Sequence, residues 1–166
     1  MTKRSRVENE IMVDSLQYTP QITLEFPIAD DDFFMAGEYA SRVKKTLQQL
    51  GLDQNIIRRV AIIIYEAAIN VAIHAHHGTL RVQIDSKGIF IQTDDVGAGI
   101  PDIELAMQEG YSTASDEIRE MGFGAGMGLF NIKQCSDELS IDSHVGEGTV
   151  LNAKVFFPEK EAVSGG

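Results

Sequence analysis

The chain has 166 residues, 43% of them hydrophobic, and carries a formal net charge of −11 at neutral pH. This length and composition predict one globular domain with a core of its own. The negative charge argues against a general binder of nucleic-acid backbones, which needs a basic face, and against attraction to an anionic membrane surface.

The single cysteine and the N-terminal sequence indicate in which cellular compartment the protein is expected. Cys135 is the only cysteine, so no disulfide can form within the chain, which favours a reducing environment. Its neighbours have a helical pattern, which favours a buried small hydrophobe over a nucleophile. The basic residues near the N-terminus precede no apolar run of signal-peptide or membrane-spanning length. We therefore expect a cytoplasmic protein.

The first third of the chain predicts an arm, a strand and a helix. Residues 1–20 have no clean period and are expected to form a flexible arm. Apolar and polar residues alternate over 22–28, which predicts a half-buried strand, and Pro27 within it favours a sheet edge or the end of the strand. Apolar residues at helical spacing over 33–50 predict a helix that stops at Gly51.

A second helix should be central to the fold. Asp53 is a suitable N-cap, and a wide apolar stripe runs from Ile57 to Ile73. We expect this helix to end at residues 76–78, with Gly78 supplying the left-handed stop.

The next stretch predicts a hairpin and a loop. Residues 80–84 alternate between apolar and polar, residues 86–88 suit a turn, and residues 89–91 return as the partner strand. A glycine-rich loop over 94–100 follows.

The last part of the chain contains a long stretch with no strand or helix pattern. Pro101 suits the first turn of a short helix that runs to about Glu109. Residues 110–125 have no regular pattern, and a gap of that length in a compact domain is usually functional. The remaining elements are a helix and two strands, at 129–135, from 139 onward and over 151–157.

The order of these elements predicts the fold class. Strands cluster instead of alternating strictly with helices, which favours an α+β fold over a doubly wound parallel one. We expect a two-layer α/β sandwich in which a mixed, mostly antiparallel sheet carries helices on one face. The domain should span residues 21–158, with a flexible tail over 159–166.

Polar residues interrupt the apolar second helix. Glu66 and Asn70 are one turn apart and therefore share a face. A polar helix edge that faces solvent explains them about as well as a functional site does. In the functional interpretation, the Asn70 amide oxygen ligates Mg²⁺ and the Glu66 carboxylate accepts a proton from an attacking hydroxyl or water.

A second candidate stretch is the loop that begins at Asp95. Its carboxylate can accept a hydrogen bond from an exocyclic amine such as the adenine 6-amino group, and Gly97 and Gly99 let the backbone approach a flat ring. An ordinary Asp-Gly loop is the alternative.

Glycines also precede the helix at 129–135. Gly122, Gly124, Gly126 and Gly128 are spaced by two, and free N–H groups at a helix start bind phosphate. No strand and no βαβ unit precede them, which argues against a Rossmann site, and no Gly-Lys-Ser/Thr sequence is present for a Walker A loop. A flexible hinge beside a lid is the plainer interpretation, and it is compatible with phosphate binding.

Two single residues complete the candidate site. Arg119 precedes the glycines, where a cation could stabilise charge on a transferred phosphate, although a solvated surface arginine explains it slightly better. Thr149 follows Gly148 at the start of the last strand, and a threonine in that position needs no function.

The candidate residues fall in four stretches, at 66–70, 95–100, 124–129 and 146–149. Taken together and in this order, they resemble the nucleotide site of the GHKL superfamily, and the resemblance covers about residues 21–157. This superfamily includes gyrase-type ATPases, histidine kinases and anti-sigma-factor kinases. The short single domain and the segment over 109–113 are most similar to the small anti-sigma-factor and stress-switch serine/threonine kinases. The resemblance implies a histidine-kinase-like ATPase fold that binds ATP and Mg²⁺.

The resemblance also assigns roles to residues. It implies Glu66 as the catalytic base, Asn70 as the Mg²⁺ ligand, and Asp95, in place of Asp94, as the adenine contact. It further implies nucleotide contacts from glycine-rich and neighbouring positions, namely Gly97, Gly99, Ile100, Arg119, Gly124, Gly126, Met127, Gly128, Leu129 and Thr149.

Two functions remain open at this level. The first is a Mg·ATP-dependent kinase that phosphorylates a Ser or Thr of a small anti-sigma antagonist protein. The second is a nucleotide-sensing module that captures a regulatory partner and turns over slowly or not at all. The resemblance implies that antagonist as a partner and perhaps a sigma factor, with a homodimer possible; neither nucleic acid nor a membrane is expected.

Overall fold

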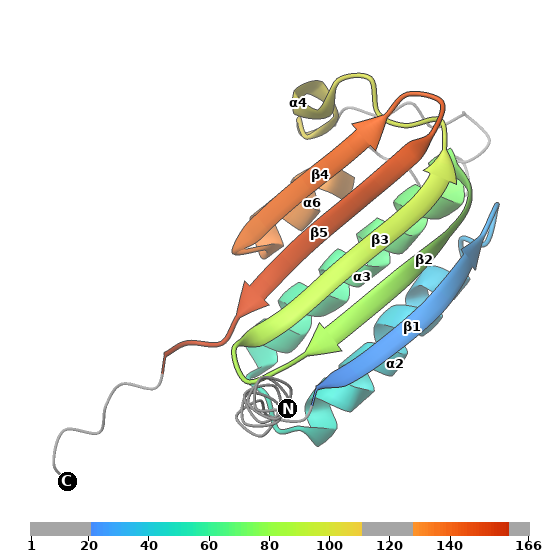
Figure 1. The fold of residues 1–166 in the computed structure, drawn as a ribbon. Coiled ribbons are helices and arrows are strands. Elements are labelled where there is room, and N and C mark those ends of the chain that lie inside the picture. The colour runs from blue at the N-terminus through green and yellow to red at the C-terminus, as the bar shows by residue number, and fades with distance from the viewer. Residues whose placement is uncertain (1–20, 111–127, 160–166) are drawn as a thin grey trace, which may run out of the picture.

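A computed structural model describes residues 21–110 and 128–159 (Figure 1). The strands are β1 (Ile22–Ala29), β2 (Ala75–Ile84), β3 (Gly88–Gly97), β4 (Glu138–His144) and β5 (Gly148–Phe156). The helices are α2 (Met35–Gln49), α3 (Gln54–His74), the short α4 (Ile103–Ala106) and α6 (Gly128–Cys135).

The strands form one sheet in the order β1-β2-β3-β5-β4. Helices α2, α3 and α6 lie on the same face of it, which confirms the two-layer α+β fold (Figure 1). The sheet was expected to be mixed, but every pair in its described part is antiparallel. The hairpins β2–β3 and β4–β5 account for two of these pairs. As Pro27 indicates, β1 is an edge strand.

Helix α3 lies between α2 and α6 on the face of the sheet and carries much of the core (Figure 1). It packs against α2 and α6 as well as against four strands. Val60, Ile63 and Ile64 are fully buried on it, as are Leu80 and Ile91 of the sheet. The wide apolar stripe in the sequence therefore reflects contacts with the sheet and with a helix on either side.

The end of α3 differs from the prediction. The helix ends at His74, and Ala75 already begins β2, with its N–H bonded to the carbonyl of Val71. Gly78 does not have a left-handed backbone; it lies inside β2, where a Cβ would come within 2.7 Å of Val71 Cγ1. The glycine is needed there because strand and helix approach closely.

Two further boundaries also differ. Strand β3 continues through Asp95 to Gly97, so the first half of the expected loop belongs to the sheet. The expected helix up to Glu109 is shorter, because α4 has four residues. Asp102 caps it by accepting a hydrogen bond from Leu105 N at 3.0 Å, and Pro101 precedes this cap.

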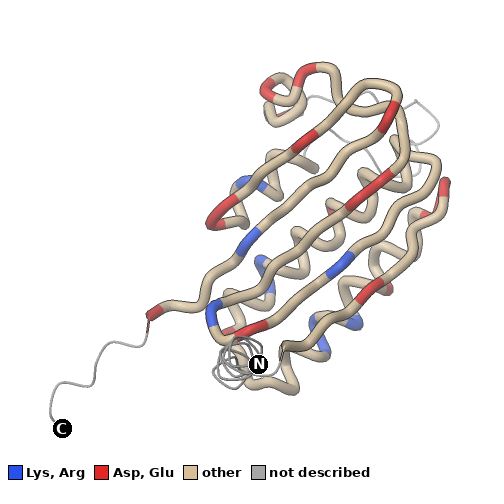
Figure 2. The backbone as a smooth tube through the Cα atoms, in the orientation of Figure 1, with Lys and Arg blue, Asp and Glu red and all other residues tan. Residues whose placement is uncertain are grey.

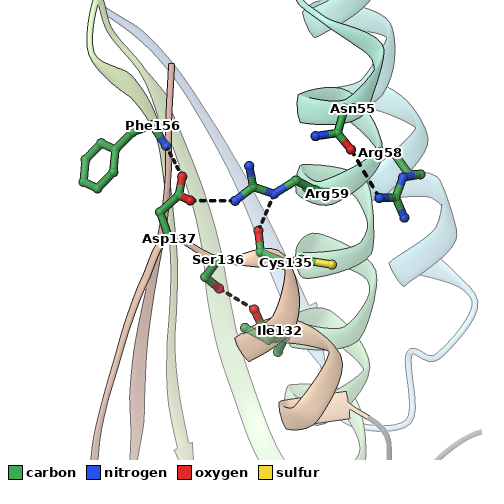
Figure 3. A network of polar contacts seen from close by, with 8 residues as sticks. All are labelled: Asn55, Arg58, Arg59, Ile132, Cys135, Ser136, Asp137 and Phe156. Carbon is green, nitrogen blue, oxygen red and sulfur yellow. Dashed lines mark hydrogen bonds and ion pairs between the residues drawn. The ribbon is translucent and has the colours of Figure 1, made fainter. Parts of the chain in front are cut away.

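A polar network fixes the C-terminal end of α6 (Figure 3). Arg59 of α3 donates from Nε to the Cys135 carbonyl at 2.9 Å and forms an ion pair with Asp137, also at 2.9 Å. The second carboxylate oxygen of Asp137 accepts a hydrogen bond from Phe156 N of β5 at 2.7 Å. Helix α6 is thereby tied to α3 and to the sheet.

Candidate nucleotide-binding site

The polar face of α3 meets the first residue of α6. Glu66 and Asn70 are both half-buried. A Cβ placed on Gly128 would lie 3.1 Å from Asn70 Oδ1 and 3.3 Å from Glu66 Oε2. The structure thus brings together three residues that the sequence predicted from two separate motifs.

Glu66 has a partner that the sequence analysis did not include. Asn131 of α6 donates from Nδ2 to Glu66 Oε1 at 3.4 Å. Burial raises the pKa of Glu66, and the hydrogen bond from Asn131 lowers it in part. The signal available in the sequence was one polar residue beside Ile132 on an otherwise apolar helix face.

Asp95 is held by the neighbouring strand. Its Oδ1 accepts a hydrogen bond from Thr149 N at 3.1 Å. Burial raises the pKa of Asp95, with the Thr149 bond opposing this change and the nearby Asp94 adding to it. Thr149 Oγ1 in turn lies 2.7 Å from Ser143 Oγ of β4, so β3, β4 and β5 all contribute to this end of the site.

The glycines around Asp95 are required by close backbone contacts. A Cβ on Gly148 would lie 2.0 Å from the Asp95 carbonyl oxygen, and one on Gly97 would lie 2.7 Å from Ala75 Cα. Gly99 has φ of +75°, and a Cβ there would lie 2.5 Å from the carbonyl oxygen of His144. Their packing role is therefore visible without any ligand.

Two more of the predicted site residues, Ile100 and Leu129, lie within the described ranges, and the others do not. Ile100 N donates to Ser143 Oγ at 2.7 Å beside Thr149, whereas Leu129 is buried in the core. The remaining predicted positions, Arg119, Gly124, Gly126 and Met127, lie outside the described residues.

The two ends of the site are joined along α3. Ala98 N donates to the carbonyl of His74 at 3.5 Å, which places the chain after β3 at the end of α3. Glu66 lies eight residues before His74, so about 12 Å of helix separates the two ends at 1.5 Å per residue. An extended nucleotide can span that distance.

Three general features of the described residues are their charges, their possible metal ligands and the lengths of their helices. Lys and Arg residues are interspersed with Asp and Glu over the described residues (Figure 2). Groups of three or more His, Cys, Asp or Glu side chains that could hold a metal ion are absent from residues 21–110 and 128–159. Within these same ranges, no helix has the length and apolar character needed to cross a membrane.

Comparison with known proteins identifies the family. The sequence model of the family described as the histidine kinase-like ATPase domain matches residues 36–155. This range includes Glu66, Asn70, Asp95 and Thr149. The chain belongs to this family. The ATP-binding domain implied by the resemblance is therefore confirmed.

Two relatives are named as a protein kinase and as an anti-sigma factor. The chain is 33% identical to the serine/threonine-protein kinase RsbT of Bacillus subtilis over 126 residues, which are 74% of this chain and 86% of that protein. It is 28% identical to an anti-sigma F factor of Thermoanaerobacter sp. (strain X514) over 145 residues, covering 82% and 93% of the two chains.

A solved structure shares the fold. A chain from the SiaB–SiaC complex of Pseudomonas aeruginosa superposes with a TM-score of 0.55 at 14% identity. The match covers 92% of this chain and 99% of that chain. At this identity the likeness concerns the fold alone.

Proposed function

We propose that the protein is an ATP-dependent serine/threonine protein kinase that transfers the γ-phosphate of ATP to a small antagonist-type partner protein. The observation that carries this proposal is the placement of Glu66 and Asn70 on one face of α3, against Gly128 at the start of α6. Family membership and the kinase RsbT, a relative of similar length, support it.

In the proposed reaction Glu66 is the general base. The hydroxyl oxygen of the partner's Ser or Thr attacks the γ-phosphorus, and the Glu66 carboxylate accepts the hydroxyl proton. The bond between the γ-phosphorus and the bridging oxygen breaks, and ADP leaves with that oxygen. Burial raises the pKa of Glu66, which brings its basicity closer to neutral pH, where a general base works best.

Asn70 fits the role of a Mg²⁺ ligand. Its amide oxygen is of the oxygen class that Mg²⁺ prefers, and it faces the same point beside Gly128 as Glu66 Oε2 does. Few protein ligands are needed, because Mg²⁺ in such sites keeps waters and binds phosphate oxygens. When bound, the ion would neutralise charge on the phosphates.

Asp95 and Thr149 form the proposed adenine end. Asp95 Oδ1 is bonded to Thr149 N, and within the described residues its Oδ2 has no partner and can accept a hydrogen bond from the adenine amine. The Thr149 hydroxyl, held by Ser143, would contact the same edge of the ring. The proposed adenine pocket also includes Gly97, Gly99 and Ile100.

The proposed phosphate end includes residues outside the described ranges. Backbone N–H groups at the start of α6, at Gly128 and Leu129, suit phosphate oxygens. The preceding glycines and Arg119 would complete this cradle; the proposed positions are Gly124, Gly126 and Met127.

The proposed partner is a protein. One relative is named an anti-sigma F factor, a name that describes a protein directed against a sigma factor. By analogy we propose a small anti-sigma antagonist as phosphate acceptor and a sigma factor as a second partner, with a homodimer as the assembly.

Nucleotide binding is tested first. Calorimetric titration with ATP and ADP, with and without Mg²⁺, should give Mg²⁺-dependent binding. Absence of any binding would contradict the proposed site.

Phosphotransfer is tested next. The protein is incubated with γ-labelled Mg·ATP and the soluble proteins of its source, and phosphoserine and phosphothreonine are located by mass spectrometry. We expect one small protein to be labelled by the wild type and not by Glu66→Gln. Binding of Mg·ATP without labelling, together with regulatory output that survives Glu66→Gln, would favour the nucleotide-sensing module.

A further inference from the structure

Asn131 is a half-buried polar residue on the inner side of α6. Its neighbours Leu129 and Ile132 are buried in the core. Asn131 Nδ2 points to α3, where it donates to Glu66 Oε1 at 3.4 Å. Within the described ranges, no other residue hydrogen-bonds to the Glu66 side chain. A half-buried amide with a single carboxylate partner is a specific arrangement, since an apolar residue would fill the same space without desolvation cost.

The two oxygens of Glu66 have different surroundings. Oε1 is directed to Asn131, one turn into α6. Oε2 is directed to Gly128, at a point that also faces Asn70 Oδ1. One oxygen is therefore held by the helix, and the other faces the place where the phosphates and the acceptor hydroxyl are proposed to meet.

We propose that Asn131 is a positioning residue for the kinase reaction: it holds Oε1 of Glu66 so that Oε2 is aimed at the acceptor hydroxyl. This inference rests on the proposed function, because it assigns Asn131 to the base of that reaction. The general base, Glu66, lies on α3, and the residue proposed to orient it, Asn131, lies on α6.

The anchoring of α6 supports this role. Arg59 and Asp137 tie the C-terminal end of the helix to α3 and β5 (Figure 3). Asn131 lies on the same short helix, between this anchor and Gly128. A donor on a fixed helix restricts the carboxylate to few orientations, and reacting groups need such restriction to reach an attack geometry.

The test compares Asn131→Leu with the wild type in steady-state phosphotransfer. Leucine has the same branching at Cγ and lacks the donor. We expect kcat to fall about 10-fold, as for the loss of one oriented hydrogen bond to a charged group, with the KM for ATP and the Kd for ADP unchanged. Gln134→Leu, an exposed amide on the same helix, is the matched control and should leave all three unchanged.

A second variant covers the case in which leucine disturbs folding. Asn131→Asp keeps the shape of the side chain and replaces the donor by a like charge, so kcat should fall at least as far as in Asn131→Leu. If kcat is unchanged in the folded variants, the inference is wrong. If Kd and kcat change in proportion, Asn131 is a nucleotide contact and the positioning role is also wrong.

Glu66→Gln separates this inference from the proposed function. Asn131→Leu added to Glu66→Gln should lower the residual rate less than about 2-fold. The reason is that in Glu66→Gln the side chain that Asn131 orients can no longer accept a proton. Loss of rate by Glu66→Gln with no effect of Asn131→Leu would overturn the inference and leave the proposed function intact. Full activity of Glu66→Gln would remove Glu66 as the base and overturn the inference. Absence of phosphotransfer in the wild type would overturn the proposed function.

The contact itself is measured without turnover. The side-chain amide signal of Asn131 in a ¹⁵N NMR spectrum should shift on Glu66→Ala and not on Glu38→Ala, a change on a distant helix. An unresponsive amide signal would show that the contact is absent and would overturn the inference whatever the activity. A responsive signal in a protein that transfers no phosphate would overturn both roles and leave only the contact.

Discussion

The two ends of the site are built in different ways. At the Asp95 end, strands β3, β4 and β5 pack so closely that Gly148 has no room for a side chain, and a backbone N–H holds the carboxylate. At the Glu66 end, two helices meet through side chains, with Asn131 bonded at 3.4 Å. Substitutions at the first end should therefore change stability and nucleotide affinity, whereas substitutions at the second should change the rate.

The largest effect on rate is expected at Glu66. Glu66→Gln keeps the shape and can still accept the hydrogen bond from Asn131, but it cannot take a proton. Phosphotransfer should fall by about 10³-fold, within the range for loss of a general base, while calorimetric affinity for ATP stays unchanged. Glu38→Gln, an exposed residue of α2, is the control. A rate within 10-fold of wild type would mean that the base lies elsewhere.

The largest effect on stability is expected at Gly148. Alanine there would place its Cβ 2.0 Å from the Asp95 carbonyl oxygen, with φ at +146°. The strands must separate, so the free energy of unfolding should fall by about 3 kcal/mol. Gly146→Ala has a φ of +81° and open space around the Cβ, and should cost about 1 kcal/mol.

Urea denaturation of both glycine variants measures this difference. Equal losses of unfolding free energy would mean that β3 and β5 can move apart at this point, so that their close contact does not restrict the residue at 148. Reduced ADP affinity is expected for Gly148→Ala only, because Thr149 and Asp95 would move apart.

A smaller effect is expected from Asp95→Asn. The amide oxygen can still accept the Thr149 N–H, but the group loses its charge and presents a donor to the adenine amine. Affinity for ADP should fall by about 10- to 100-fold, the value of a hydrogen bond to a charged group. Asp94→Asn, on the exposed neighbour, should leave it unchanged. Equal affinities in all three proteins would remove Asp95 from the site.

Periodicity explains what could be predicted from the sequence. The spacing of Glu66 and Asn70 predicted a shared face, since side chains four apart on a helix are neighbours, and the structure places both beside Gly128. The α+β fold followed from the order of the strands and is confirmed. The functional roles of these residues, and the boundaries at 21 and 158, stay predictions.

Tertiary contacts explain what could not be predicted. Asn131 meets Glu66 because α6 packs on α3, 65 residues away in sequence, and no local pattern reports such a contact. The end of α3 at His74 differs from the prediction because Gly78, whose position suits a helix stop, is a strand residue that faces Val71. A glycine signals a lack of space as often as it signals a turn.

The smallest effect is a pH dependence of stability at Asp95. Burial raises the pKa of this carboxyl in the folded state above its ordinary value, so the folded state holds the proton more tightly than the unfolded state does. The resulting stabilisation is complete below the unfolded pKa and is lost as the pH rises through the folded pKa. Asp95→Asn mimics the protonated form at every pH. In a series of urea denaturations, its stability relative to wild type should therefore increase as the pH rises through that window, by less than the loss expected for Gly148→Ala. A difference that is constant with pH would show that the Thr149 hydrogen bond offsets the burial of the carboxylate.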